Sequence, residues 1–138
     1  VPAPSTAPAV KTAPATVGGA SATILTNAQG MTLYYFDSDS TTTSACTGSC
    51  TQLWPALISS SGAPAAPSGV NGNFSIINGG NGAQVAYNGH PLYTYSGDTA
   101  PGQTKGNGLF GKWHVATPST AQNTNAGSNN PGYGNNGY

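Results

Sequence analysis

The stretch LYYFDSD at residues 33–39 returns later in the chain as LYTYSGD at residues 92–98. The two stretches are offset by 59 residues, and the same offset relates Trp54 to Trp113. Aromatic and acidic positions that keep one spacing over this distance indicate an internal duplication. The sequence therefore predicts one structural unit that is used twice.

Each copy begins with the pattern of a β-hairpin, in which Asn and Gly residues that tolerate positive φ lie between short β-prone runs. A long polar loop and a tryptophan follow, so we expect Trp54 and Trp113 to lie in short strands that close the units. The run FSII (74–77) predicts another strand between the units, and no segment has helical periodicity over a useful length. The hairpins comprise strands 23–26 and 31–36 around the turn 27–30, and strands 84–87 and 91–95 around the turn 88–90.

Side-chain alternation along the duplicated stretch predicts where the core lies. Tyr34 and Phe36 should share one face of their strand, and Tyr93 and Tyr95 should match them in the second copy. The chain has few large aliphatic residues, so we expect aromatic rings to supply the core. The functional alternative is a sugar-binding platform, because flat rings stack on apolar faces. We favour the core role.

These patterns predict an all-β protein in which two repeated hairpin-based units pack as one small β domain. The domain should span residues 20–118, with repeats at about 20–58 and 84–118. A Pro/Ala/Thr-rich extended arm (1–19) precedes it and an Asn/Gly/Tyr-rich arm (119–138) follows it. The composition of both arms is typical of disordered chain, and we expect contacts with neighbouring copies to order them.

Charged residues are almost absent, because three lysines and three aspartates are the only ones among 138 residues and the net charge is zero. Nothing resembles the basic surface that nucleic acid requires. Little electrostatic repulsion keeps copies of such a chain apart, so its surface permits close self-association. The alternative is a neutral secreted domain that hydroxyl groups keep soluble.

The two cysteines indicate an oxidising compartment. Cys46 and Cys50 are too few for a four-ligand zinc site, and the histidines lie far away in sequence, so a local disulfide is the best interpretation. The chain starts at Val1 with Pro/Ala-rich sequence, as a mature chain does once its export signal is removed. No apolar stretch approaches the roughly 20 residues of a membrane helix. We expect a secreted or cell-surface protein without a membrane span.

The duplicated motif resembles the secreted repeat family of predicted bacterial lipoproteins, whose pattern is Y-x-[FWY]-x-x-D. The cysteine pair that is followed by Trp54-Pro55 and the glycine-rich run before Trp113 are also similar to that family. The resemblance covers about residues 21–118 and implies export and a β-rich repeat, but no activity. The chain departs from the lipoprotein members in having Val1 where they have a cysteine. The matching motif residues are Tyr34, Phe36 and Asp39 in the first copy and Tyr93, Tyr95 and Asp98 in the second.

Few residues suggest a metal site. Asp39 and Asp98 follow the aromatic strands, and we expect each to accept backbone N–H bonds and fix the next loop. Asp37 and Asp39 are weak candidates for calcium, which needs six to eight oxygen ligands. His90 and His114 lie outside the duplicated pattern, and are weak candidates for copper or zinc if folding brings them together. We therefore assign no metal.

No residue pattern suggests catalysis or a bound cofactor. The chain lacks Glu, Arg and a nucleophile elbow, and its glycine-rich run (102–111) lacks the strand-to-helix context of a phosphate loop. We expect a structural protein, not an enzyme, whose copies form an extracellular fibre or layer through β-strand and arm contacts, with residues 20–26 as a donor strand. The alternative is a monomeric binding module for a sugar, a metal or a redox partner. Glycans are a further candidate partner. Asn73-Phe74-Ser75 is a glycosylation motif that has meaning only in a glycosylating host.

Overall fold

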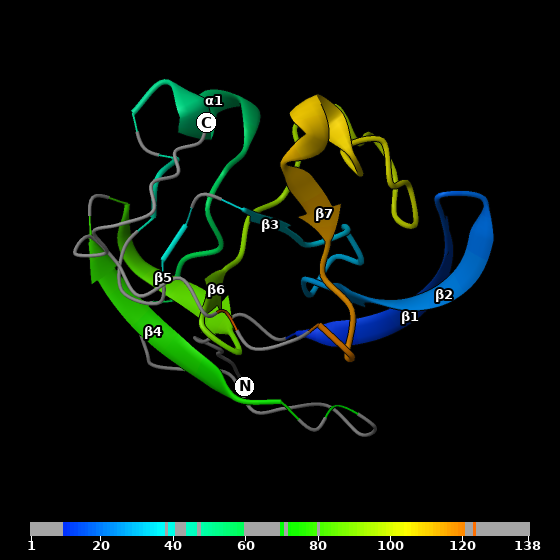
Figure 1. Ribbon diagram of the computed structural model, residues 1–138, viewed down its shortest axis with the longest axis horizontal. Helices are drawn as coiled ribbons and strands as arrows, with labels where there is room; N and C mark the ends of the chain where they lie inside the picture. Colours follow the sequence, from blue (N-terminus) through cyan, green and yellow to red (C-terminus); the bar gives the residue numbers. More distant parts are fainter. Residues whose placement is uncertain are drawn as a thin grey trace, which may run out of the picture.

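The computed structural model describes residues 10–37, 39–40, 44–46, 48–59, 70, 72–79, 81–120 and 123. Most of the predicted C-terminal arm, and residues 1–9 of the N-terminal one, lie outside these ranges. The described residues form small sheets with almost no helix, which confirms the predicted all-β class (Figure 1). The elements are β1 (Lys11–Val17), β2 (Ala20–Thr26), β3 (Tyr34–Phe36), α1 (Cys50–Leu53), β4 (Phe74–Gly79), β5 (Gly82–Tyr87), β6 (His90–Pro91), the 3-10 turn η1 (Leu109–Gly111) and β7 (Trp113–Val115).

Each repeat opens with an antiparallel hairpin. β1 pairs with β2 in the first repeat, and β4 pairs with β5 in the second. The two hairpins, blue and green in Figure 1, lie on opposite sides of the molecule. Gly18 and Gly19 make the first turn with φ of 61° and 88°, the left-handed values that a tight two-residue hairpin requires. The repeated unit therefore includes a hairpin that precedes the duplicated stretch in each repeat.

Three features differ from the sequence prediction. Trp54, which we expected in a short strand, directly follows α1 and lies in no strand, whereas Trp113 begins β7 as expected. Residues 11–17, which we expected within an extended arm, form β1 and pair with β2. The strand expected between the units is β4, which occupies the place in the second repeat that β1 occupies in the first. The segment 20–26 pairs with β1 of its own chain, so it is not an available donor strand. The sequence patterns did not predict β1, because this strand contains Pro14. Proline is rare in strands and is usual only in those at the edge of a sheet.

The two repeats exchange strands near the middle of the molecule. β3 of the first repeat pairs with β7 at the end of the second. In return, Tyr93 forms a bridge with Ala56, and the Thr94 N–H donates to the Pro55 carbonyl at 2.8 Å. Between these pairs, Tyr34 and Tyr93 exchange both backbone hydrogen bonds, at 2.7 and 2.9 Å. Neither repeat completes its β structure with its own strands.

The core has two parts, and alternation along β3 divides its side chains between them as predicted. Tyr34 and Phe36 contribute to one part, and Leu33 and Tyr35 to the other. The expectation that rings supply the core holds for one part only, since the other is mainly aliphatic. The aliphatic part contains Val10, Leu25, Leu33, Leu57, Val70, Val85, Tyr87, Leu92 and Ala116, and the aromatic part contains Ile24, Tyr34, Cys46, Trp54, Tyr93, Trp113 and Val115.

Candidate interaction surface

The duplicated tyrosines and aspartates bind each other across the two repeats. The Tyr34 hydroxyl donates to Oδ2 of Asp98 at 2.6 Å, and the Tyr93 hydroxyl donates to Oδ2 of Asp39 at 2.8 Å. All four side chains are buried. A phenol in a core needs a hydrogen-bond partner, and a carboxylate there needs donors. The motif therefore joins the two repeats.

Each aspartate also accepts a backbone N–H from the loop that follows it. Oδ1 of Asp39 accepts from Ala45 at 2.5 Å, and Oδ1 of Asp98 accepts from Lys105 at 2.9 Å. Sequence reasoning proposed this loop contact but missed the tyrosine partner. The duplication could have indicated the Tyr–Asp pairing. Two buried phenols require two hydrogen-bond acceptors, and the motif supplies one acidic residue in each repeat.

Burial of these groups changes their acid–base behaviour. Removal from water raises the pKa of Asp39 to about 7, although the N–H of Ala45 and the hydroxyl of Tyr93 favour its charged form. Burial likewise holds the pKa of Tyr34 and of Tyr93 far above the usual range of a phenol, and the neighbouring carboxylates reinforce the effect. At neutral pH the two hydroxyls are therefore donors.

Four rings form a stack in which the repeats alternate. Phe36 stacks on Trp113 with centroids 4.4 Å apart, Trp113 on Trp54 at 3.7 Å, and Trp54 on Tyr95 at 4.4 Å. The two indole planes differ by only 2°. Trp54 and Trp113 are 2% and 3% exposed, so the faces of both indoles are occupied inside the molecule. The stack packs the repeats together and leaves no indole face for a sugar.

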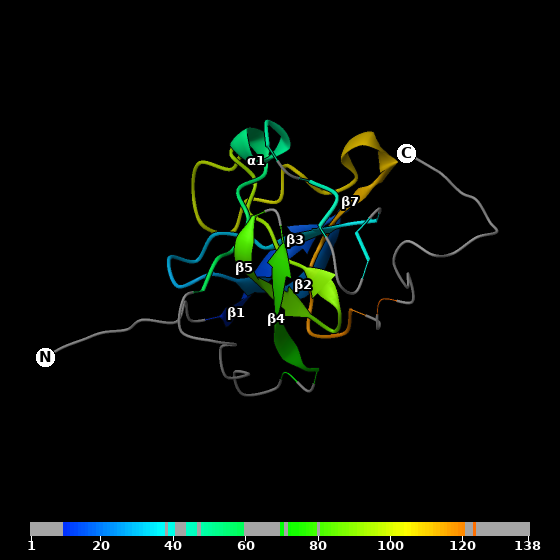
Figure 2. The same ribbon diagram turned by 90° about the vertical axis from the view of Figure 1, so that its left-hand side faces the viewer.

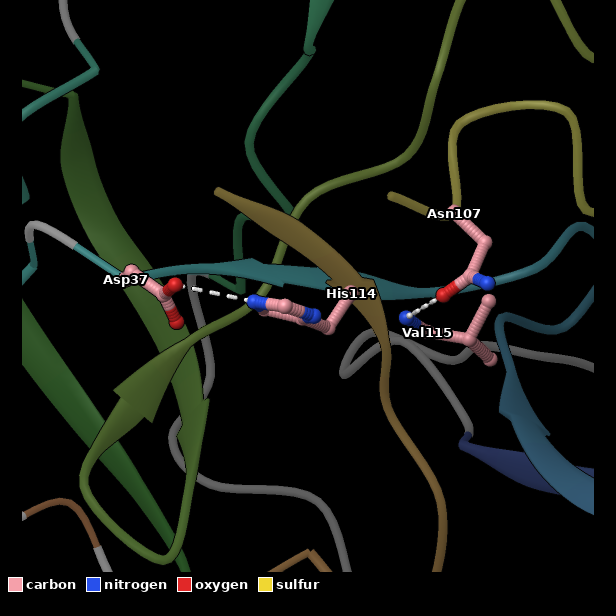
Figure 3. Close-up of polar contacts among 4 residues, drawn as sticks. All are labelled: Asp37, Asn107, His114 and Val115. Atoms are coloured by element: carbon pink, nitrogen blue, oxygen red, sulfur yellow. Dashed lines mark hydrogen bonds and ion pairs between the residues drawn. The ribbon is translucent and has the colours of Figure 1, made fainter. Parts of the chain in front are cut away.

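The weak metal candidates do not come together at one site. Nε2 of His114 lies 2.9 Å from Oδ2 of Asp37 near the surface (Figure 3). Asp39 is buried in its contact with Tyr93. The rings of His90 and His114 each contact Tyr35, with centroids 4.4 and 5.3 Å away. Among the residues that the structure describes, no three His, Cys, Asp or Glu side chains are grouped to hold a metal ion.

Cys46 and Cys50 form a disulfide in the loop between β3 and Trp54. Cys46 is buried against the aromatic part of the core, and Cys50 begins α1. The bridge closes a loop of only a few residues, so on the loop-entropy model it contributes about 2 kcal/mol to stability. It fixes the chain locally, close to the buried Asp39–Tyr93 contact.

The outer edge of β4 is open within the part of the chain that the structure describes. β5 lies on one side of β4, and no described strand pairs with the other side. Alternate residues of an antiparallel strand bond to the neighbour, and the Asn88 N–H donates to the Asn73 carbonyl at 2.8 Å. The backbone groups of Phe74, Ile76 and Asn78 therefore point outward. This edge has no charge and no proline, and it is rich in β-prone residues.

The outer edge of β1 is less able than that of β4 to pair with another strand. The same alternation directs Thr12, Pro14 and Thr16 outward. Pro14 has no N–H to donate, and the Thr16 carbonyl already accepts the hydroxyl of Thr104 at 2.8 Å. Lys11 adds a positive charge at the start of the strand. Proline and lysine are the means by which natural sheets prevent edge-to-edge pairing, so β1 is protected whereas β4 is not.

One exposed aromatic residue stands out at the end of the molecule that holds α1. Phe110 in η1 is 75% exposed and has a φ of 56°, which a bulky side chain rarely adopts. Both Figure 1 and Figure 2 place η1, the gold turn before β7, at the same end as α1. Leu53 of α1 is also exposed. Sequence reasoning did not single out these residues, since neither belongs to the repeated pattern.

Comparison with known proteins gives one finding. A family model described as a secreted repeat of unknown function matches residues 15–58 and again residues 75–117, which together make up more than half of the chain. Both segments begin within the first hairpin of a repeat, in agreement with the structural boundaries. Comparison with curated proteins and with solved structures found no match. In the described part of the chain, no helix has the length and apolar character to cross a membrane.

Proposed function

Because this chain belongs to the family of secreted repeats of unknown function, we propose that it is an extracellular structural protein whose copies assemble through the outer edge of β4. The assembled form is a surface fibre or layer. The observation that carries the proposal is the contrast between the two edges described above. One edge is protected by Pro14 and Lys11, and the other presents outward N–H and C=O groups without either.

The sequence of β4 suits it to pairing with another chain. Phe74, Ile76 and Ile77 have high β-propensity, and the exposed side chains of Ser75 and Asn78 carry no charge. Short segments with these properties pair readily when a sheet edge is exposed. A strand edge that has no partner among the described strands gains hydrogen bonds on both strands when a second chain aligns with it.

The low charge of the whole molecule favours the same outcome. Three lysines and three aspartates leave a net charge of zero, and Asp39 and Asp98 are buried. Copies therefore approach with almost no long-range repulsion. The rigid body that the Tyr–Asp contacts and the ring stack create would hold β4 in a constant orientation, which repeated assembly requires.

Two substitutions on β4 test the proposal. Asn78→Pro removes an outward N–H at an exposed position, and Ser75→Lys places a charge at another exposed position. We expect the parent protein to sediment as species much larger than its 13.7 kDa mass and to give fibres or sheets in negative stain. Both variants should remain monomeric under the same conditions.

Thr23→Lys is the matched control, because it adds the same charge to an exposed residue of β2, a strand that pairs with β1 and whose Leu25 bonds to Ala116 and Leu33 on its other side. This control should assemble like the parent. Thermal unfolding checks that every variant is folded. A parent protein that stays monomeric over a wide concentration range, or β4 variants that assemble as well as the control, would show that the β4 edge has no such role.

Phe110 supports a second candidate function, a monomeric binding module. An exposed ring held on a strained backbone is a feature that functional sites often retain. Such a ring would stack on the apolar face of a sugar. Retention of the monomer on immobilised polysaccharide, and its loss in Phe110→Ala, would favour this candidate. Unchanged elution of that variant would exclude it.

A further inference from the structure

In an extended conformation, the sequence that precedes β1 would have one side free of proline. Residues 1–9 read VPAPSTAPA, with prolines at positions 2, 4 and 8 and at no odd position. In an extended strand, successive N–H groups point to opposite sides. All three missing donors therefore fall on one side, and the N–H groups of the odd residues occupy the other. β1 follows the same pattern. Its proline, Pro14, is also at an even position, and the backbone nitrogen of Pro14 faces away from β2.

From these observations we propose that residues 1–9 of one copy add as a strand to the outer edge of β4 in the next copy. The proposal rests on the proposed function and names the segment that occupies the β4 edge. The N–H groups of Ala3, Ser5 and Ala7 would face β4, and the prolines would face solvent. Prolines in sheets occupy this kind of edge position.

The register between β1 and β2 leaves the proline-free side of residues 1–9 available to pair with β4 of another copy. Lys11 pairs with Thr26, the last residue of β2, and the chain then turns at residues 27–30. β2 therefore offers no partner to residues before Lys11. Nine extended residues reach ~30 Å, whereas the six residues of β4 need only ~20 Å.

The chemistry of the two strands is compatible. Residues 1–9 contain only Ala, Ser, Thr, Val and Pro, so they carry no charged side chain. Small side chains of this kind would lie beside Phe74 and Ile76 of β4, which are half-buried and pack on the aliphatic part of the core. An added strand would cover these two side chains further.

The geometry of growth also favours the arm. Pairing of β4 with β4 of a second copy is symmetric and closes as a dimer. Pairing of residues 1–9 with β4 is a head-to-tail contact, so every added copy presents a new β4 edge and a new arm. Contacts of this kind produce filaments when they do not close into rings.

Two neighbouring residues give a sharp test in the full-length protein. Ala7→Pro removes an N–H from the side that would face β4, and Thr6→Pro adds another proline on the solvent side. Both changes lie outside the described fold, and thermal unfolding should be the same for both. Filament mass is measured by sedimentation, and filament form by negative-stain microscopy.

We expect Thr6→Pro to form filaments like the parent, and Ala7→Pro or deletion of residues 1–9 to reduce filament mass at least tenfold. If both proline variants and the deletion assemble normally while Asn78→Pro does not, the arm is not the partner and the proposal is overturned, although assembly through β4 stands. If the parent itself fails to assemble, both this proposal and the proposed function are overturned.

Discussion

The phenol of Tyr34 and the carboxylate of Asp98 come from different repeats, yet they form one buried hydrogen bond of 2.6 Å. Tyr93 and Asp39 repeat the arrangement at 2.8 Å. A hydrogen bond to a charged group contributes about 1.5–3 kcal/mol, and loss of one partner leaves the other unsatisfied in the core. The duplicated six-residue motif of this chain thus joins the first repeat to the second.

Removal of one phenol tests this role. Tyr34→Phe deletes the hydroxyl and leaves the ring, so we expect the free energy of unfolding to fall by about 2 kcal/mol. Chemical denaturation followed by tryptophan fluorescence measures the change. Tyr95→Phe is the control, because Tyr95 is only half-buried, and its effect should stay within about 0.5 kcal/mol. Equal effects of the two substitutions would contradict the assigned role of the Tyr34 hydroxyl.

Asp39 makes stability depend on pH in a defined direction. Burial raises its pKa to about 7 in the folded state, whereas an unfolded aspartate titrates near its model value of 3.8. The folded protein therefore binds the proton more tightly, and the resulting stabilisation is complete below pH ~4 and lost as the pH rises to ~7. The predicted loss over this window is on the order of 4 kcal/mol.

Denaturation curves measured between pH 4 and pH 8 check this dependence. Asp39→Asn has no proton to lose, so its stability should change much less over the same interval. A parent protein whose stability rises with pH in this window would show that Asp39 is ionised throughout, and that its hydrogen bonds outweigh the effect of burial.

At the scale of elements, sequence patterns predicted the strands whose side chains alternate clearly and failed where another rule competed. β3, β5 and the tryptophan strand β7 follow from runs of β-prone residues beside turn signals. β1 was missed because Pro14 and the Pro/Ala composition favour an extended arm. The strand exchange between repeats could not be predicted, because local patterns do not reveal which of two similar strands becomes the partner.

The candidate surface was predictable only in its chemistry. The low charge suggested self-association from the sequence alone. The β4 edge required the structure, because Phe74–Gly79 reads as a strand whether it lies at the centre of a sheet or at its edge. Only the pairing with β5 on one side, and with no described strand on the other, identifies it as an edge.

Pro14 gives a prediction at this scale. Pro14→Thr restores an outward N–H on β1 and raises its β-propensity, so the outer edge of β1 becomes competent to pair. We expect faster and more extensive association, seen as increased light scattering during assembly and as laterally thickened fibres. Ala15→Thr changes a neighbouring residue whose N–H already faces β2, and should behave like the parent. No difference between the two variants would mean that Pro14 does not protect this edge.

At the scale of the whole molecule, duplication and strand exchange pack the two repeats into one body that resembles a fused dimer. The ring stack alternates between repeats, and β3 pairs with β7 at the end of the second repeat. Such a body presents β4 on one side and its protected counterpart β1 on the other (Figure 1). The proposed contacts between copies therefore lie at the edges of this body, whereas the contacts that stabilise it lie at its centre.

Amide hydrogen exchange in the assembled protein tests the central claim most directly. The N–H groups of Phe74, Ile76 and Asn78 point away from β5, and we expect them to exchange quickly in dilute monomer and slowly in assembled material. The N–H groups of Ser75 and Ile77, which bond to β5, should be protected in both states. Fast exchange at residues 74, 76 and 78 in assembled protein would contradict assembly through β4.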